Sequence, residues 1–211
     1  MRVIKAIFLS IVLLGAASSV QAEVLAPDTL IQNTVQEILV IVKQDKDIQA
    51  GNKDKVLALV DAKIVPHFDF VRMTQLAVGK YWRGASAEQK QALVKEFRTM
   101  LIRTYTAAFS GYRNQTIEVA PVKMADSDTE VTVKTKILKP GAPSVLVNYE
   151  MEKTADGWKV FDLSTEGSSL VMSSRSTFAQ QIKDGGIDGL IKALVDKNAS
   201  LINATAKAEV K

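Results

Sequence analysis

The chain has 211 residues, of which 47% are hydrophobic and 24% charged, a composition typical of one globular domain or two small ones that excludes wholesale disorder. The formal net charge of +4 is small, and the basic residues are interspersed with acidic ones, which argues against a nucleic-acid-binding surface. With no cysteine and one histidine, the chain can form no disulfide, cysteine-based zinc site, thiol nucleophile or histidine-cluster metal site.

The first 22 residues are typical of a secretory signal peptide. Arg2 and Lys5 make the start basic, a mainly apolar run of eleven residues follows, and Val20 and Ala22 place small residues at the −3 and −1 positions of a cleavage site. The apolar run is much shorter than the roughly 20 residues that span a bilayer. We therefore expect cleavage after Ala22 and export of residues 23–211 as a soluble, single-domain protein.

Helical spacing of apolar residues dominates the first half of the mature chain. It predicts a helix that begins at Pro27 and closes at 49–52, followed by helices over 53–64 and 68–78. The longest predicted helix runs from Ser86 to about Ser110. Ser86 and Gln89 have the spacing of a capping box, in which a hydroxyl and an amide satisfy the free N–H groups of the first turn.

In the second half of the mature chain, apolar residues recur at every second position. Alternating apolar and polar residues predict four consecutive strands over 116–122, 129–138, 144–153 and 158–164. Short links between them predict an antiparallel meander with one buried face. Two further helices are expected over 170–183 and 187–201, separated by Gly185 and Gly186. The predicted fold class is α+β, with a helical lobe (23–111 plus 170–201) packed on a sheet (115–165).

No recognisable set of catalytic residues emerges from the sequence. Serine-nucleophile signatures, the dinucleotide-binding glycine motif and the Walker A loop do not occur. His67 is a possible general base, but its place between a proline and a phenylalanine is typical of a partly buried residue near a turn. Glu150 and Glu152 share the predicted solvent face of one strand, whereas Asp162 and Glu166 lie near the end of the last strand. We assign no catalytic and no metal-binding residue.

The strongest pattern in the sequence is apolar. The long predicted helix carries a stripe formed by Leu93, Phe97, Leu101, Tyr105, Ala108 and Tyr112, and the meander and the C-terminal helices offer further apolar faces. These faces form either a filled core or a hollow one that holds a ligand, and spacing alone does not distinguish the two. Periodicity therefore predicts an exported α+β protein whose apolar surfaces face one another.

Six short segments also resemble a known family. They are PHFDF (66–70), LAVGKYW (76–82), ASAEQ (85–89), DGWKVFD (156–162), EGSSL (166–170) and GGIDGL (185–190). In this order and spacing they resemble the toluene-tolerance family of periplasmic phospholipid-binding proteins, over about 25–201. The sequence departs from that pattern at Ser168, where the family more usually has an apolar residue, and at Ser174, where it often has an aromatic one. These departures concern the shape of the pocket rather than the class of protein.

The resemblance implies a periplasmic carrier with a sheet like that of the NTF2 fold and helices enclosing an apolar cavity. It implies that the cavity holds the acyl tails of a glycerophospholipid, as cargo and not as a cofactor, and that the protein is not an enzyme. The implied partners are an outer-membrane lipoprotein–porin complex and an inner-membrane ABC transporter with its periplasmic substrate-binding component, in a system that maintains outer-membrane lipid asymmetry. No nucleic acid is expected among them.

The residues expected to contact lipid combine this implication with the apolar stripes. They are Phe68, Met73, Leu76, Tyr81, Trp82, Phe97, Leu101, Tyr105, Ala108, Val133, Val147, Tyr149, Met151 and Val171. Tyr81 and Trp82 are placed at the pocket mouth, because amphipathic rings suit an apolar–wet boundary. Arg72, Lys80 and Arg83 are candidates to meet a phosphate. Two alternatives stay open: an enzyme on an NTF2-like cone that uses Asp162 or His67, and a ligand-free chaperone or adaptor.

Overall fold

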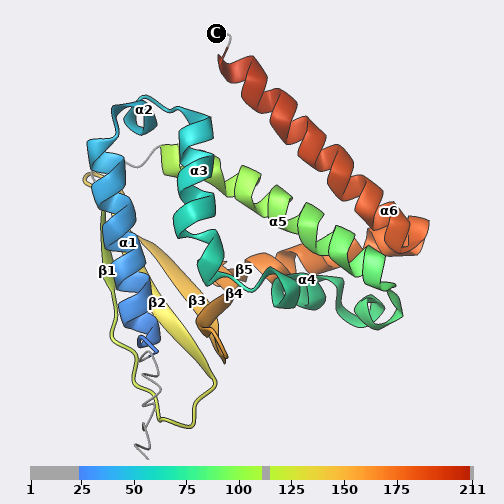
Figure 1. Ribbon diagram of the computed structural model, residues 1–211, viewed down its shortest axis with the longest axis horizontal. Helices are drawn as coiled ribbons and strands as arrows, with labels where there is room; N and C mark the ends of the chain where they lie inside the picture. The colour runs from blue at the N-terminus through green and yellow to red at the C-terminus, as the bar shows by residue number, and fades with distance from the viewer. Residues whose placement is uncertain (1–23, 111–114, 210–211) are drawn as a thin grey trace, which may run out of the picture.

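The computed structural model describes residues 24–110 and 115–209, without the side chains of 107–110 and 204–209. The predicted signal peptide lies outside the described residues. Helices occupy both ends of the described part of the chain and a five-stranded sheet lies between them, which confirms the predicted α+β class (Figure 1). Among the described residues, none of the helices has the length and apolar character needed to cross a bilayer.

The described part of the chain begins with three helices: α1 (Pro27–Gln44), α2 (Lys46–Gln49) and α3 (Lys53–Lys63). The prediction of one helix from Pro27 to 49–52 was wrong, because Asp45 ends α1 in an extended conformation and caps α2. Its carboxylate accepts hydrogen bonds from the backbone N–H groups of Asp47 and Ile48, at 2.9 and 3.1 Å.

A short 3₁₀ turn, η1 (Val65–His67), leads into α4 (Phe70–Val78), and η2 (Gly79–Gly84) leads into α5 (Ala87–Ser110). Helix α4 begins two residues later than predicted, because the Asp69 side chain caps it by accepting the N–H of Arg72 at 2.8 Å. The capping box of α5 is confirmed. The Gln89 amide oxygen accepts the N–H of Ser86 at 3.0 Å, and the Ser86 hydroxyl accepts the N–H of Gln89 at 3.1 Å.

The strands form an antiparallel sheet in chain order. They are β1 (Thr116–Val119), β2 (Glu130–Leu138), β3 (Val145–Thr154), β4 (Gly157–Thr165) and β5 (Ser168–Ser169). The four-stranded meander is therefore confirmed, with a two-residue fifth strand that was not predicted. A bulge interrupts the pairing of β3 with β4, since Glu150 faces Asp162 while Met151 faces Val160. Phe161 is the extra residue of this bulge.

The last helix, α6 (Leu170–Glu209), contains one non-helical residue, Gly186, with φ 68° and ψ −171°. Two helical segments separated by a glycine break were predicted and are confirmed, although the second continues beyond the expected end at 201. Figure 1 shows α6 reversing direction at the right of the molecule, and its second segment packs against α5 through Leu190, Leu194 and Asn198.

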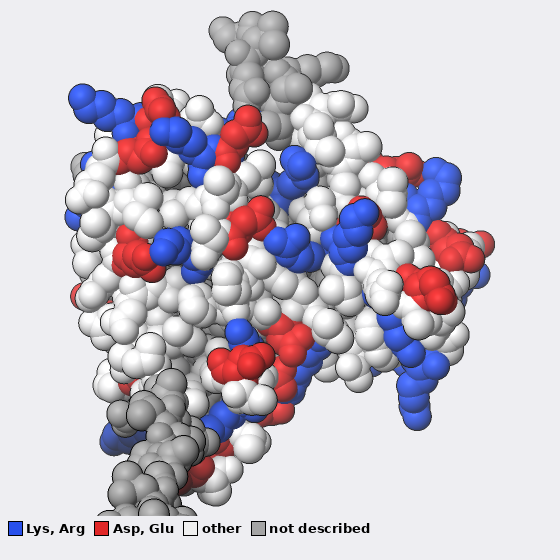
Figure 2. Space-filling model, viewed as in Figure 1, with Lys and Arg blue, Asp and Glu red and all other residues white. Residues whose placement is uncertain are grey.

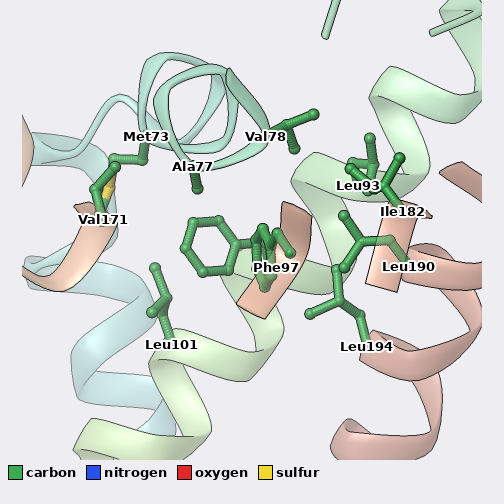
Figure 3. Close-up of a cluster of buried hydrophobic side chains, with 11 residues drawn as sticks. Met73, Ala77, Val78, Leu93, Phe97, Leu101, Val171, Ile182, Leu190 and Leu194 are labelled. Carbon is green, nitrogen blue, oxygen red and sulfur yellow. The ribbon is translucent and has the colours of Figure 1, made fainter. Parts of the chain in front are cut away.

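Three clusters of buried apolar side chains hold these elements together. The first joins α4, α5 and α6 around Phe97 (Figure 3), whose ring meets that of Phe178 edge to face at 5.1 Å. The second joins the start of α1 to the sheet around Met151 and Trp158, and the third joins the end of α1 to α2 and α3 around Val56. The clusters do not merge into one core, and this separation positions the site described next.

Candidate functional site

A pocket of about 250 Å³ lies between α1 and the sheet, where the second and third clusters meet. Six residues of α1 form one wall, and residues of η1, the sheet and the end of α3 form the rest. Its lining consists of Ile31, Thr34, Val35, Ile38, Leu39, Val42, Ile64, His67, Phe68, Ile117, Ile137, Tyr149, Val160 and Leu163.

A smaller pocket of about 100 Å³ adjoins it between α3, α4 and α5. The two pockets share the lining residues Ile64, Phe68 and Leu163. The smaller one is completed by Val60, Val65, Phe70, Met73, Leu101, Ile102, Tyr105, Thr106 and Leu170. We call the larger one the sheet-side pocket, and the two together the apolar groove.

Phe68 occupies the junction of the two pockets because the backbone fastens it to the sheet. It forms a parallel bridge with Val160 of β4, and the next N–H, that of Asp69, donates to the Val160 carbonyl at 2.9 Å. The Phe68 ring stacks on that of Phe70, with centroids 5.7 Å apart. The linker between η1 and α4 is thereby fixed against an edge of the sheet, and its aromatic side chain is held within the groove.

The groove presents few polar atoms to an occupant. Among the described residues, none that lines it is Asp, Glu, Lys or Arg. The hydroxyls of Thr34 and Thr106 donate back to the carbonyls of Leu30 and Ile102, at 2.8 and 2.6 Å, so their polar groups are already satisfied within their own helices. Burial raises the pKa of Tyr149, and the neighbouring Thr135 side chain opposes this increase. Such a lining favours an uncharged, hydrocarbon-like occupant.

His67 differs from the rest of the lining. Partial burial lowers its pKa below the usual value of 6.5, and the positive charge of Lys159 lowers it further, against an opposing effect of Glu37. The Lys159 ammonium donates to the Pro66 carbonyl at 2.6 Å. One end of the sheet-side pocket therefore combines an imidazole with a nearby ammonium group.

The structure distributes the predicted lipid-contact residues between the groove and the clusters around it. Phe68, Met73, Leu101, Tyr105 and Tyr149 line the groove. The others lie elsewhere: Phe97 and Val171 in the first cluster, Leu76, Tyr81 and Trp82 packed against that cluster, Val133 and Met151 in the second, and Val147 buried on β3. The side chain of Ala108 and the whole of Tyr112 lie outside the described residues.

The candidate phosphate-binding residues also separate. The Arg72 guanidinium forms ion pairs with Glu130, at 2.6 Å, and with Glu152, so its charge is already compensated. Lys80 and Arg83 are exposed on η2. Figure 2 shows Lys and Arg interspersed with Asp and Glu on the face of α1, α3 and α5.

Sequence reasoning predicted α1 but did not assign it to the site. Its apolar residues Ile31, Val35, Ile38, Leu39 and Val42 have ordinary amphipathic spacing, and five of its six groove-lining residues belong to that set. The same spacing is found on any helix packed against a filled core. The sequence therefore contained the signal for a buried face, but nothing that marked this face as the wall of a pocket.

Asp162 has a structural task. One oxygen of its carboxylate accepts the N–H groups of Leu163 and Val171, at 2.8 and 3.1 Å, and the other accepts the hydroxyl of Ser169. These bonds fix the turn from β4 into α6 and occupy the carboxylate. Within 24–110 and 115–209, no group of three or more acidic or histidine side chains is placed to hold a metal ion.

The described geometry defines an α+β protein with an uncharged apolar groove between a curled antiparallel sheet and its helices. The model of the MlaC protein family matches residues 32–196, and the chain belongs to that family. The resemblance to toluene-tolerance proteins is thereby confirmed.

Two curated relatives and one solved structure are similar to the chain. The intermembrane phospholipid transport system binding protein MlaC of Haemophilus influenzae is 25% identical over 79% of each chain. The toluene tolerance protein ttg2D of Pseudomonas putida is 27% identical over 84% of this chain and 83% of its own. A phospholipid-binding protein from Ralstonia solanacearum, solved in complex with a phospholipid, is 39% identical with a TM-score of 0.77, over 83% of this chain and 98% of its own.

Proposed function

We propose that the mature chain, residues 23–211, is a single-domain periplasmic carrier that holds the acyl tails of a glycerophospholipid in the apolar groove. The observation that carries the proposal is the uncharged lining of the groove, whose threonine hydroxyls are bonded within their own helices. The phospholipid complex of the Ralstonia solanacearum relative supports it. The lipid is cargo rather than cofactor, and its tails lie against Phe68, Leu101 and Tyr149 among others. Contact between lipid and the predicted residues outside the groove stays a prediction.

The physical need for such a carrier follows from the tails. Each buried methylene is worth about 0.8 kcal/mol, so two tails of about 15 carbons each are disfavoured in water by roughly 24 kcal/mol. A groove about as apolar as a bilayer removes this barrier without any chemical step. Transfer is then nearly neutral in free energy, and its direction is set by the complexes that load and unload the carrier.

We further propose that those complexes are an outer-membrane lipoprotein–porin complex and an inner-membrane ABC transporter with its periplasmic substrate-binding component. The name of the Haemophilus influenzae relative, which places that protein in an intermembrane phospholipid transport system, supports this assignment. Exchange between the two complexes would maintain outer-membrane lipid asymmetry. An enzymatic role is disfavoured, because the Asp162 carboxylate is occupied in capping α6.

The deciding experiment is mass spectrometry of the protein purified without detergent from a periplasmic extract. We expect a mature chain that begins at Glu23 and carries phospholipid in a fixed molar ratio. Delipidated protein should regain phospholipid from vesicles. A chain that retains Met1, or one that neither carries nor regains phospholipid, would contradict the proposal. Turnover of a substrate that His67→Ala or Asp162→Asn abolishes without unfolding would favour the enzyme alternative.

A further inference from the structure

The polar end of the groove carries an inference that rests on the proposed function. His67 is the one histidine of the chain and lines the sheet-side pocket, whose other lining residues are apolar, Thr34 or Tyr149. It is neither fully buried nor fully exposed, so its ring stands at the boundary between the apolar lining and water. A ligand with its tails in the groove has to change there from hydrocarbon to polar group.

Lys159, which lines neither pocket, reaches the backbone beside His67 from the sheet. Its side chain extends from β4 to η1, where its ammonium donates to the Pro66 carbonyl at 2.6 Å. It forms no ion pair with any carboxylate of the described residues, and its positive charge is felt at His67. This half-exposed ammonium has donor capacity left over after one hydrogen bond, because it carries three donors.

The other charges near His67 largely cancel. Glu37 of α1 acts against the lowering of the His67 pKa, but the Glu37 carboxylate is paired with Lys63 of α3 at 2.6 Å. Among the described residues, the charges that act on His67 are therefore Glu37, which is paired with Lys63, and Lys159, which stands opposite Glu152 in the register of β3 and β4 but forms no ion pair with it. This balance suits an anion, and both His67 and Lys159 can donate hydrogen bonds to it.

We infer that His67 and Lys159 form a subsite for the phosphate of the bound lipid, in which protonated His67 and Lys159 donate to the phosphodiester oxygens. The subsite distinguishes a phospholipid from an uncharged lipid with the same tails. Because a nearby anion favours the charged imidazole, phospholipid binding takes up a proton and strengthens as the pH falls through the His67 titration. The lining of α1 supplies affinity for the tails at every pH.

The test compares two short-chain lipids that are soluble as monomers, dihexanoyl-phosphatidylglycerol and dihexanoylglycerol, binding to the delipidated full mature chain. Calorimetry from about pH 8 to about pH 5.5 spans the ordinary histidine titration while carboxylates stay ionised. We expect phosphatidylglycerol to bind about two- to fivefold more tightly at the acidic end, and dihexanoylglycerol to bind equally at both ends.

Two variants and one control identify the residues. His67→Gln should abolish the pH dependence for phosphatidylglycerol. Lys159→Met should weaken phosphatidylglycerol at every pH and move the transition to higher pH, because the cation that lowers the His67 pKa is gone. Lys159→Met should leave dihexanoylglycerol binding unchanged, whereas His67→Gln, at a lining residue, should leave that binding independent of pH. Lys192→Met, which removes the same charge from an exposed site on α6, should leave both lipids unchanged.

The outcomes separate this inference from the proposed function. If both lipids bind but His67→Gln and Lys159→Met keep the parent pH profile and affinities, the subsite is wrong while the carrier stands. If neither lipid binds to the parent protein, the carrier is wrong as well. A titration with inorganic phosphate alone distinguishes the source of the anion. Saturable binding of free phosphate that both variants abolish would overturn the assignment to a lipid headgroup.

Discussion

The guanidinium carbon of Arg72 lies 3.6 Å from the centre of the Phe161 ring, and the same guanidinium is ion-paired with Glu130 and Glu152. Arg72 belongs to α4, whereas its three partners stand on β4, β2 and β3. The β-bulge is what presents Phe161 as an extra residue at this point. One side chain therefore fastens α4 to three strands beside the apolar groove.

Replacing this arginine should destabilise the protein. In Arg72→Met the Glu152 carboxylate, whose side chain is 20% exposed, loses its cation, and the Phe161 ring loses its stacking partner. The free energy of unfolding should therefore fall by about 1–3 kcal/mol. The matched control is Arg98→Met, which breaks a more exposed pair with Asp61 and should cost about 0.5 kcal/mol. Urea unfolding of the two variants provides the comparison. Equal losses would show that Arg72 is an ordinary surface cation.

The kink of α6 depends on the conformation of Gly186. Its φ of 68° and ψ of −171° lie in a region open essentially to glycine, so Gly186→Ala should destabilise the protein by about 1–3 kcal/mol. Gly185→Ala is the matched control, since Gly185 lacks a positive φ and an added Cβ would meet nothing within 4 Å at either position. It should be neutral or stabilising by up to about 1 kcal/mol. Thermal melting of the pair tests whether backbone strain alone decides the outcome.

Filling the groove should separate lipid loading from stability. Val35 lines the sheet-side pocket, whereas Val40 on the same helix is 51% exposed and lines neither pocket of the groove. In Val35→Phe the ring should displace roughly three methylene groups of a tail. The loss in binding free energy should be about 2 kcal/mol, which lowers lipid affinity more than tenfold. The lipid-free protein should lose little stability. Val40→Phe should load lipid normally.

The measurements for this pair are phospholipid per protein and melting curves with and without lipid. Bound lipid stabilises the native state, and that increment should shrink in Val35→Phe alone. A filled core would behave differently, because overpacking would destabilise the lipid-free form by about 1–3 kcal/mol. Unchanged loading together with that loss would place Val35 in solid core.

His67 should make the lipid-free protein less stable in mild acid. The pKa of His67 is lowered in the folded state, so the unfolded chain binds the proton more readily than the folded protein does. The contribution of neutral His67 to stability is therefore fully present only above its usual pKa of 6.5. Stability should fall as the pH drops below that value, until the folded form also becomes protonated. Urea unfolding at several pH values measures this, with His67→Gln as the control that lacks the decline. An equal decline in both proteins would assign it to other groups.

Local signals predicted most of the fold. The capping box of Ser86 and Gln89 and the glycine break of α6 were correct because each depends on residues close in sequence. The division of the first helix at Asp45 was missed, since an aspartate within a helical pattern can face solvent or cap a new helix. The bulge at Phe161 was missed because only the pairing of two strands reveals an extra residue.

The candidate site was less predictable from the sequence. An apolar residue that faces a groove and one that faces a filled core have the same period, so Phe68 and Phe97 gave the same signal although only Phe68 lines the groove. Helix α1 forms a wall of the groove because the three apolar clusters are separated in space. That separation is a property of tertiary packing. His67 drew attention as the one histidine, but its relation to Lys159 required the position of η1 against β4.

The separation of the three apolar clusters has a consequence for cooperativity. The three residues shared by both pockets connect these clusters. Ile64 packs against the third cluster, Phe68 against the first and the second, and Leu163 against the second. A hydrocarbon occupant at that junction would touch all three at once and act as the shared centre that the polypeptide itself does not supply. Without it, α1 can open by a local fluctuation that leaves α4, α5 and α6 intact, and its amides should exchange hydrogen faster than theirs. With it, the exchange rates of the two regions should converge, because the cargo joins separate packing units into one folding unit.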